Sequence, residues 1–318
     1  MDASFERSVH LPAKSLKALK GRSDIRGWLK VASHIGAIAI NSILLFSTLG
    51  SWLTLPFFML QGILINCLYA GVHELSHNTV FKTQGINELF GRLFCLILLM
   101  GRDQDKFEHF QHHRHTQNVE LDAEIVGAKP FTLLTYLVYF FGLSYWPGRI
   151  AEVFRLASGD TQSWPYLSAV QLKKVHKEAR LMLLIYLSIL LISLVFQSTL
   201  LLTLWLLPMF AMKWFQMLQN TVEHTGMPHV DDIWLNTRTV KAGPVMQWLL
   251  WNMPYHTAHH TYPMIPFYRL PDLHRQIVAE AGDQPNTISH IGFQRQMIRK
   301  LLTDGSSKYS GRDILEYK

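Results

Sequence analysis

Two long uncharged blocks limit what this chain can fold into. No Asp, Glu, Lys or Arg occurs from Val31 to His73, or from Leu181 to Met212. At about 1.5 Å of rise per residue, the first block gives roughly 60 Å of helix, enough to cross a hydrocarbon core of about 30 Å twice. The second block, extended past Lys213 to Leu218, is of similar reach. The pattern predicts an all-α integral membrane protein, although a very apolar pair of buried core helices would also leave long uncharged runs.

Each block has a polar interruption near its middle. Ser47, Thr48, Gly50 and Ser51 interrupt the first, and Gln197 and Ser198 interrupt the second. Polar residues at these places indicate turns between two membrane passes. We therefore expect four transmembrane helices arranged as two hairpins, over residues 31–72 and 181–218.

The charges around the blocks predict the orientation of the chain. The first 30 residues carry seven Lys or Arg against three acidic residues, which favours a basic cytoplasmic N-terminal segment (residues 1–30) over a cleaved signal peptide. Two hairpins return the chain to its starting side. Residues 73–180 and 219–318 are then expected to form one cytoplasmic helical cap, with the C-terminus also cytoplasmic and the whole chain a single membrane-bound domain.

Net charge and cysteine content exclude some classes of protein. The formal charge of +7 needs no nucleic acid to explain it, because cations that flank membrane spans face anionic headgroups. Cys67 and Cys95 are the only cysteines and both stand in apolar surroundings. Neither a disulfide framework nor a thiolate metal site is expected.

Several shorter segments can be interpreted individually. Phe131 to Trp146 is rich in aromatic residues and short for a span, so we expect a helix lying at the membrane interface. Lys14–Leu19 and Ile291–Leu302 have the pattern of amphipathic helices, and 261–274 contains too many prolines for one regular helix. A polar tail is expected at 306–318.

Histidine is the residue type that carries the chemistry. Of sixteen histidines, nine fall into four clusters next to the apolar blocks, at His73, His77, His109, His112, His113, His224, His256, His259 and His260. Spacings of three and four place imidazoles on one helix face, about one turn apart. Imidazole suits Fe, Zn, Cu and Ni, and nine candidate ligands fit two metal ions better than one.

The remaining histidines are expected to have ordinary structural roles. These are His10, His34, His176, His229 and His290, while His115 and His274 are candidates only for hydrogen bonds to the ligands.

The first cluster also fits HExxH, a zinc protease pattern, with His73 and His77 as ligands and Glu74 as general base. A membrane zinc protease is therefore an alternative of a different class. A non-catalytic protein that binds or transports metal is a third.

The complete set of motifs resembles a known family. The segments "HELSH", "HFQHH" and "HTAHH", with Asn220 and His224 between the second and third, resemble the membrane-bound fatty acid desaturase and hydroxylase family. The segment "HHTYPMIPFYRLPDLH" is similar to the one after the third histidine box in acyl-lipid desaturases. The segments "HRHTQ", "NTRTV" and "NMPYH" resemble the bacterial rhizopine and rhizobitoxine desaturase-like branch. The resemblance extends from Gly71 to His274.

The resemblance implies a histidine-rich diiron centre that activates O2, held by four transmembrane helices and a cytoplasmic cap. It gives metal-ligand roles to the nine clustered histidines, and Asn220 would hold a metal-bound water. Glu74 and Glu223 are candidates to accept hydrogen bonds from the outer imidazole nitrogens. The first box has three intervening residues where many acyl-CoA desaturases have four, which argues against an acyl-CoA substrate.

The expected activity is O2-dependent introduction of a double bond into a fatty acyl chain or other membrane lipid. A hydroxylase or ketolase, or a desaturase of a small amino-acid derivative, would use the same fold. The sequence has no GxGxxG fingerprint, cysteine cluster or fused haem module. An external ferredoxin or cytochrome-type electron donor with its reductase is therefore expected.

Overall fold

The computed structural model describes residues 7–125 and 131–303, and these residues are mostly helical. The first six residues and the expected polar tail at 306–318 lie outside the described residues. One feature departs from the all-α prediction, because β1 (Thr239–Lys241) and β2 (Thr287–Ser289) pair in parallel. The strands pair two segments 46 or more residues apart, a tertiary contact that local sequence patterns do not report.

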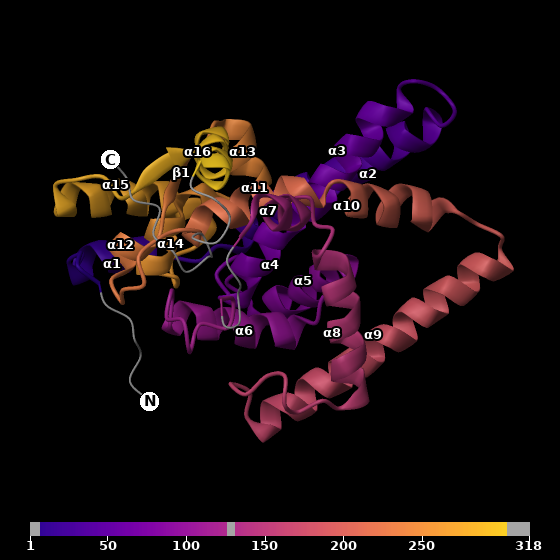
Figure 1. Ribbon diagram of the computed structural model, residues 1–318, viewed down its shortest axis with the longest axis horizontal. Coiled ribbons are helices and arrows are strands. Elements are labelled where there is room, and N and C mark those ends of the chain that lie inside the picture. Colours follow the sequence, from indigo (N-terminus) through magenta and orange to yellow (C-terminus); the bar gives the residue numbers. More distant parts are fainter. Residues whose placement is uncertain (1–6, 126–130, 304–318) are drawn as a thin grey trace.

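The first apolar block forms the expected hairpin (Figure 1). α2 (Asp24–Ser47) begins before the uncharged block because Ser23 caps it, accepting a hydrogen bond from Arg26 N. α3 (Thr54–Asn66) and α4 (Leu68–Ser76) follow almost without a break and count together as one candidate span. The predicted polar interruption is confirmed, since it separates α2 from α3.

The second apolar block differs from the expected hairpin. α9 (Ala169–Val195) is a single long helix and ends just before the predicted interruption. The chain then returns through a π-helical turn, η1 (Leu202–Leu206), and α10 (Leu207–Ala211). Within the described residues, three helices are long and apolar enough to cross a membrane, and the returning segment is not among them. A complete set of four spans therefore stays a prediction.

Pro208 accounts for the irregular return. Proline has no N–H, so the carbonyl of Leu204 loses its helical partner, and Gln61 Nε2 on α3 donates to this carbonyl over 2.9 Å. A second amide on α3, Asn66 Nδ2, donates to the Met209 carbonyl over 2.8 Å. Gly62 allows this approach, because an added Cβ would lie 2.1 Å from Pro208 O. Hydrogen bonds from two amide side chains thus hold η1 and α10 against α3.

α10 packs on α3 and diverges from α9 (Figure 1). α9 packs instead on α8 (Tyr145–Ser158) and α6 (Arg102–Arg114). The second pair of apolar helices is therefore open between its two arms.

The middle of the chain holds four shorter helices. α5 (Gln84–Ile97) and α6 meet at a bend of 102°. The prediction of a single helix over Phe131–Trp146 is wrong. The segment forms α7 (Leu133–Phe140), a turn, and the start of α8. Gly142 makes that turn at φ +72°, and an added Cβ there would lie 2.5 Å from Lys213 Cγ.

The remaining helices follow α10 in the sequence. The described C-terminal part contains α11 (Lys213–His224), α12 (Ile233–Asn236), α13 (Pro244–Leu249), η2 (Met253–Tyr255), α14 (His256–Thr261), η3 (Phe267–Arg269), α15 (Leu270–Ala281) and α16 (His290–Thr303). The break between α14 and α15 confirms the expectation from the prolines. α1 (Ala13–Leu19) and α16 confirm the two predicted amphipathic helices.

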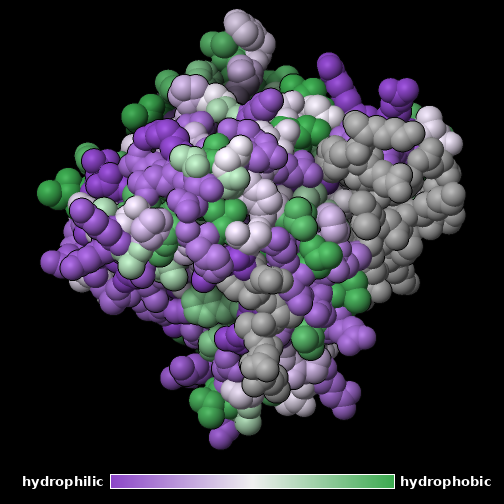
Figure 2. Space-filling model, turned by 90° about the vertical axis from the view of Figure 1, so that its left-hand side faces the viewer, coloured by the Kyte–Doolittle hydropathy of each residue, from purple (hydrophilic) through white to green (hydrophobic). Residues whose placement is uncertain are grey.

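Hydropathy separates the two ends of the molecule. Figure 2 shows the end opposite the α2–α3 and α9–α10 turns, where hydrophilic residues predominate. Large exposed hydrophobic side chains follow α2 and α9, including Ile43, Phe46, Leu190 and Val195. The main apolar core joins α4 and α5 to the segment around α14 and α15, and it supports the histidines described next.

Candidate metal centre

Four helices bring the nine predicted histidines together. His73 lies near the end of α4, His77 follows the last residue of this helix, one turn after His73, and α6 presents His109, His112 and His113. The C-terminal residue of α11 is His224, and α14 carries the last three, His256, His259 and His260. α4 forms the end of the candidate span Thr54–Ser76, so the cluster lies at the end of an apolar helix.

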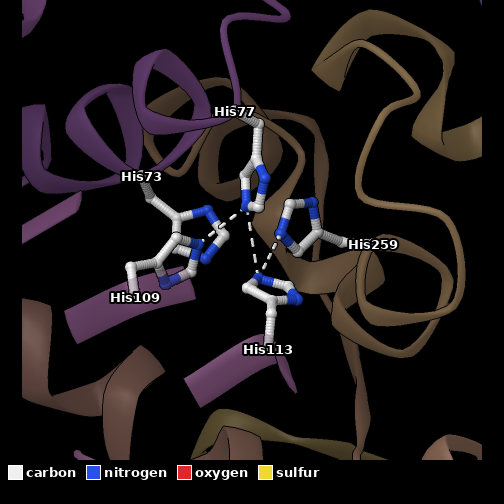
Figure 3. A group of neighbouring side chains, drawn as sticks. All are labelled: His73, His77, His109, His113 and His259. Atoms are coloured by element: carbon white, nitrogen blue, oxygen red, sulfur yellow. Dashed lines mark hydrogen bonds between the residues drawn. The ribbon is translucent and has the colours of Figure 1, made fainter. Parts of the chain in front are cut away.

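The larger group contains five imidazoles (Figure 3). One ring nitrogen from each of His73, His77, His109, His113 and His259 lies within 4.8 Å of the others. Nε2 of His77 is 2.7 Å from Nε2 of His109 and 3.2 Å from Nε2 of His113. Both histidines of the first box therefore belong to the same group.

The second group contains His112, His224 and His260, again within 4.8 Å of one another. His256 adjoins it, with its Nε2 2.8 Å from Nε2 of His224. The nine histidines thus form one group of five and one of four. Seven of them are buried, and His77 and His224 are partly buried.

The outer imidazole nitrogens meet oxygen acceptors. His112 Nδ1 donates to both carboxylate oxygens of Asp122 at 3.0 Å, and His224 Nδ1 donates to the Asn236 carbonyl at 3.1 Å. Two glutamates lie similarly close, with Glu74 Oε1 3.2 Å from His259 Nδ1 and Glu223 Oε1 3.3 Å from His256 Nδ1. Such partners fix the ring orientation and the tautomer of metal-binding histidines.

The pair His224 and His256 shows what the inner space requires. A carbonyl oxygen only accepts hydrogen bonds, so the proton of neutral His224 is on Nδ1 and its Nε2 carries a lone pair, while Glu223 Oε1 lies 3.3 Å from His256 Nδ1. Burial, with the neighbouring imidazoles, lowers the pKa of His224 to about 3 and that of His256 well below its usual value. The Nε2 lone pair of neutral His224 thus points at Nε2 of His256 across 2.8 Å. Two imidazole nitrogens that face each other this closely can bind one cation.

The donor set therefore fits metal ions that prefer imidazole, among them iron. Two separate groups indicate two ions. His260 Nε2 is buried without a hydrogen-bond partner among the described residues, which is a further nitrogen available to a metal.

A cavity of about 120 Å³ adjoins the histidines. Asn220, the predicted holder of a metal-bound water, lines it together with Tyr69, Tyr139 and Met253. This metal-site cavity is the space in which a reacting group would reach the centre.

The other histidines lie outside both groups. His34 bonds the Leu64 carbonyl, His176 the Asp160 carbonyl, His229 the Gln117 carbonyl, and His290 the Gln219 side chain. His10 is exposed.

Two partners of the histidines escape prediction from sequence. Asp122 lies in a loop ten residues beyond His112, and its polar surroundings resemble those of a solvated carboxylate. Asn236 acts through its backbone carbonyl, which leaves no trace in the residue type. For Asp122 the available signal is a carboxylate in the loop that follows a histidine box.

Glu74 has a location unlike that of a protease base. It is fully buried, Thr79 Oγ1 donates to its Oε2 over 2.9 Å, and its Oε1 faces the outer nitrogen of His259. A general base must reach a water on the metal, on the inner side of the imidazoles.

Helices with apolar spans, and histidine clusters at their ends, define a membrane protein with a candidate dimetal centre. Comparison with known families agrees with this class. The sequence model of the fatty acid desaturase family matches residues 50–292, most of the chain, and the protein belongs to that family.

One relative with an assigned activity is the sn-1 oleoyl-lipid 12-desaturase of Picosynechococcus sp.. The two sequences are 24% identical over 152 residues, which is 48% of this chain and 40% of the relative. The chain thus aligns with less than half of that protein's length.

Proposed function

We propose that this protein is an O2-dependent diiron oxidoreductase that introduces a double bond into a fatty acyl chain of a membrane lipid. The observation that carries the proposal is the pair of histidine groups, whose inner nitrogens face each other beside apolar helices. Membership of the fatty acid desaturase family and the similarity to a lipid 12-desaturase support it.

The chemistry requires a metal. An unactivated methylene needs a stronger oxidant than any side chain, and two iron ions with O2 supply that oxidising power. The proposed iron ligands are the nine clustered histidines, with Asn220 acting through a water. The overall reaction consumes O2, two electrons and two protons in addition to the two hydrogens of the substrate, and it releases two waters.

The protein's own residues hold and orient the centre. Asp122, Glu74, Glu223 and the Asn236 carbonyl fix the imidazoles from outside. The external electrons are proposed to come from a ferredoxin or cytochrome-type carrier with its reductase, with the termini and the centre on the cytoplasmic side.

The test is product analysis in a host that lacks the activity. Membranes from cells expressing the protein are expected to contain lipids that have lost two hydrogen atoms per acyl chain. The matched variants are His109→Ala, which removes a proposed ligand, and His10→Ala, which changes an exposed histidine. The proposal fails if lipids are unchanged while the protein is folded and iron-loaded. Products that have gained one oxygen atom would indicate a hydroxylase instead.

A further inference from the structure

A second cavity lies between the diverging arms of the apolar helix pair. It has a volume of about 690 Å³ and is formed by α8, α9, η1 and α10. We call it the outer cavity. Its lining is almost entirely apolar, with Val153 and Phe154 from α8, Leu190 and Leu194 from α9, and Leu202 and Phe210 from the returning segment.

The polar groups of two aromatic residues in the outer cavity already donate hydrogen bonds within the protein. Trp205 Nε1 donates to the Ile97 carbonyl over 2.7 Å, and Tyr186 OH donates to the Leu96 carbonyl over 2.8 Å. Because both polar tips are bonded to the end of α5, the rings contribute apolar surface to the lining.

One cation interrupts this apolar surface. Arg149 lines the outer cavity, and its Nη1 pairs with Glu152 at 2.8 Å. Its Nε is buried and has no hydrogen-bond partner among the described residues. A buried N–H without an acceptor is costly, so an oxygen-bearing group at this end of the cavity would stabilise the site.

Arg149 is also linked through other side chains to the metal-site cavity. Its guanidinium lies over the Tyr145 ring, 5.4 Å from the ring centre, and Lys213 Nζ lies over the same ring at 3.4 Å. Lys213 donates to Gln216, which lines the metal-site cavity. Contacts of Tyr145 and Lys213 thus connect a lining residue of the outer cavity to a lining residue of the metal-site cavity.

We propose that the outer cavity binds one acyl chain of a membrane lipid or fatty acid, with the ester or carboxylate oxygens at Arg149. Three features select this occupant. α9 is a candidate span that is only 11% buried, so the cavity faces hydrocarbon. The volume is that of a small-ligand site of about 300–1,000 Å³, not of a helix from another copy. The single cation complements the polar end of a lipid.

The experiment uses the full-length, iron-loaded protein in lipid nanodiscs with a fatty acid that carries a photoreactive diazirine in its chain. Cross-linked peptides are mapped by mass spectrometry. Leu190 lines the cavity and its neighbour Leu191 does not, although both are about equally exposed, at 54% and 52%. Leu190→Trp should abolish labelling of the cavity walls, and Leu191→Trp should leave it unchanged.

A second filling variant, Leu202→Trp on the opposite wall, repeats the test if Leu190→Trp does not fold. Unchanged labelling in a folded filling variant, or equal labelling of cavity-facing and outward-facing residues of α9, overturns the proposal and indicates ordinary bilayer contact. Arg149→Gln should remove the advantage of the free acid over its methyl ester, and an unchanged ratio would contradict the role of Arg149. Labelling reports binding alone, so these outcomes are independent of whether the proposed oxidation occurs.

Discussion

Asp122 is fully buried, and both of its carboxylate oxygens accept a hydrogen bond from His112 Nδ1 at 3.0 Å. The same carboxylate accepts the backbone N–H of Gln117 at 2.8 Å. The Asp122 carboxylate therefore binds both the backbone of the loop after the second histidine box and the ring of His112, a proposed iron ligand.

The first prediction concerns that carboxylate. Asp122→Asn removes the charge and replaces one acceptor oxygen with an NH2 group that faces the N–H of His112 Nδ1. Iron affinity should therefore fall by about 10–100-fold. Competition with a chelator, followed by iron determination, measures this. Glu120→Gln in the same loop is exposed and serves as the control. Equal iron retention in both variants would show that Asp122 does not orient His112.

Glu74 separates two functional classes. If it holds His259 from outside, Glu74→Gln should lower iron affinity and leave measurable oxidation of lipid once iron is in excess. A zinc protease would lose peptide hydrolysis entirely, because the general base would be gone. Complete loss of a zinc-dependent peptidase activity in this variant would contradict the oxidoreductase.

The contact between α3 and α10 predicts a change in stability. Gly62→Ala forces a Cβ against the Pro208 carbonyl and should cost about 1–3 kcal/mol. Gly36→Ala is the matched control in α2, where an added Cβ has nothing within 4 Å, and it should be neutral or stabilising by up to about 1 kcal/mol. Thermal unfolding in detergent compares the two. The packing is wrong if both variants melt alike.

Metal-free protein should be sensitive to acid. The pKa of His224 is lowered by burial from 6.5 to about 3, and the pKa values of His256, His259 and His260 are lowered in the same direction. Below pH 6.5 the unfolded chain therefore binds more protons than the folded one, and stability falls as the pH drops from about 6.5 towards 3. Unfolding of chelator-treated protein measured across this range tests the sign. Stability that rises on acidification would contradict the buried neutral rings.

Sequence predicts the candidate ligands better than their surroundings. HxxHH on a helix brings its imidazoles to one face whatever the rest of the chain does, so the spacing alone locates His109 and His113 beside each other. The partners of those rings depend on how loops fold back, as at Asp122, or on backbone atoms, as at Asn236. Neither leaves a local pattern.

The same distinction applies to the helices. Uncharged length predicts α2, α3 and α9, because burial in hydrocarbon is a property of composition. The divergence of α10 from α9 follows from Pro208, Gln61 and Gly62. Their effect depends on tertiary contacts, such as the hydrogen bond from Gln61 to Leu204, which are 143 residues apart. Gly142 likewise allows the close approach of Lys213, which lies 71 residues further along the chain.

The two groups of histidines are proposed to hold two irons. Metal analysis of the purified full-length protein tests this proposal most directly, by elemental analysis against protein concentration. About two irons per chain are expected, because the inner nitrogens form two separate groups, each with enough imidazoles for one ion. One zinc per chain with no iron would contradict it.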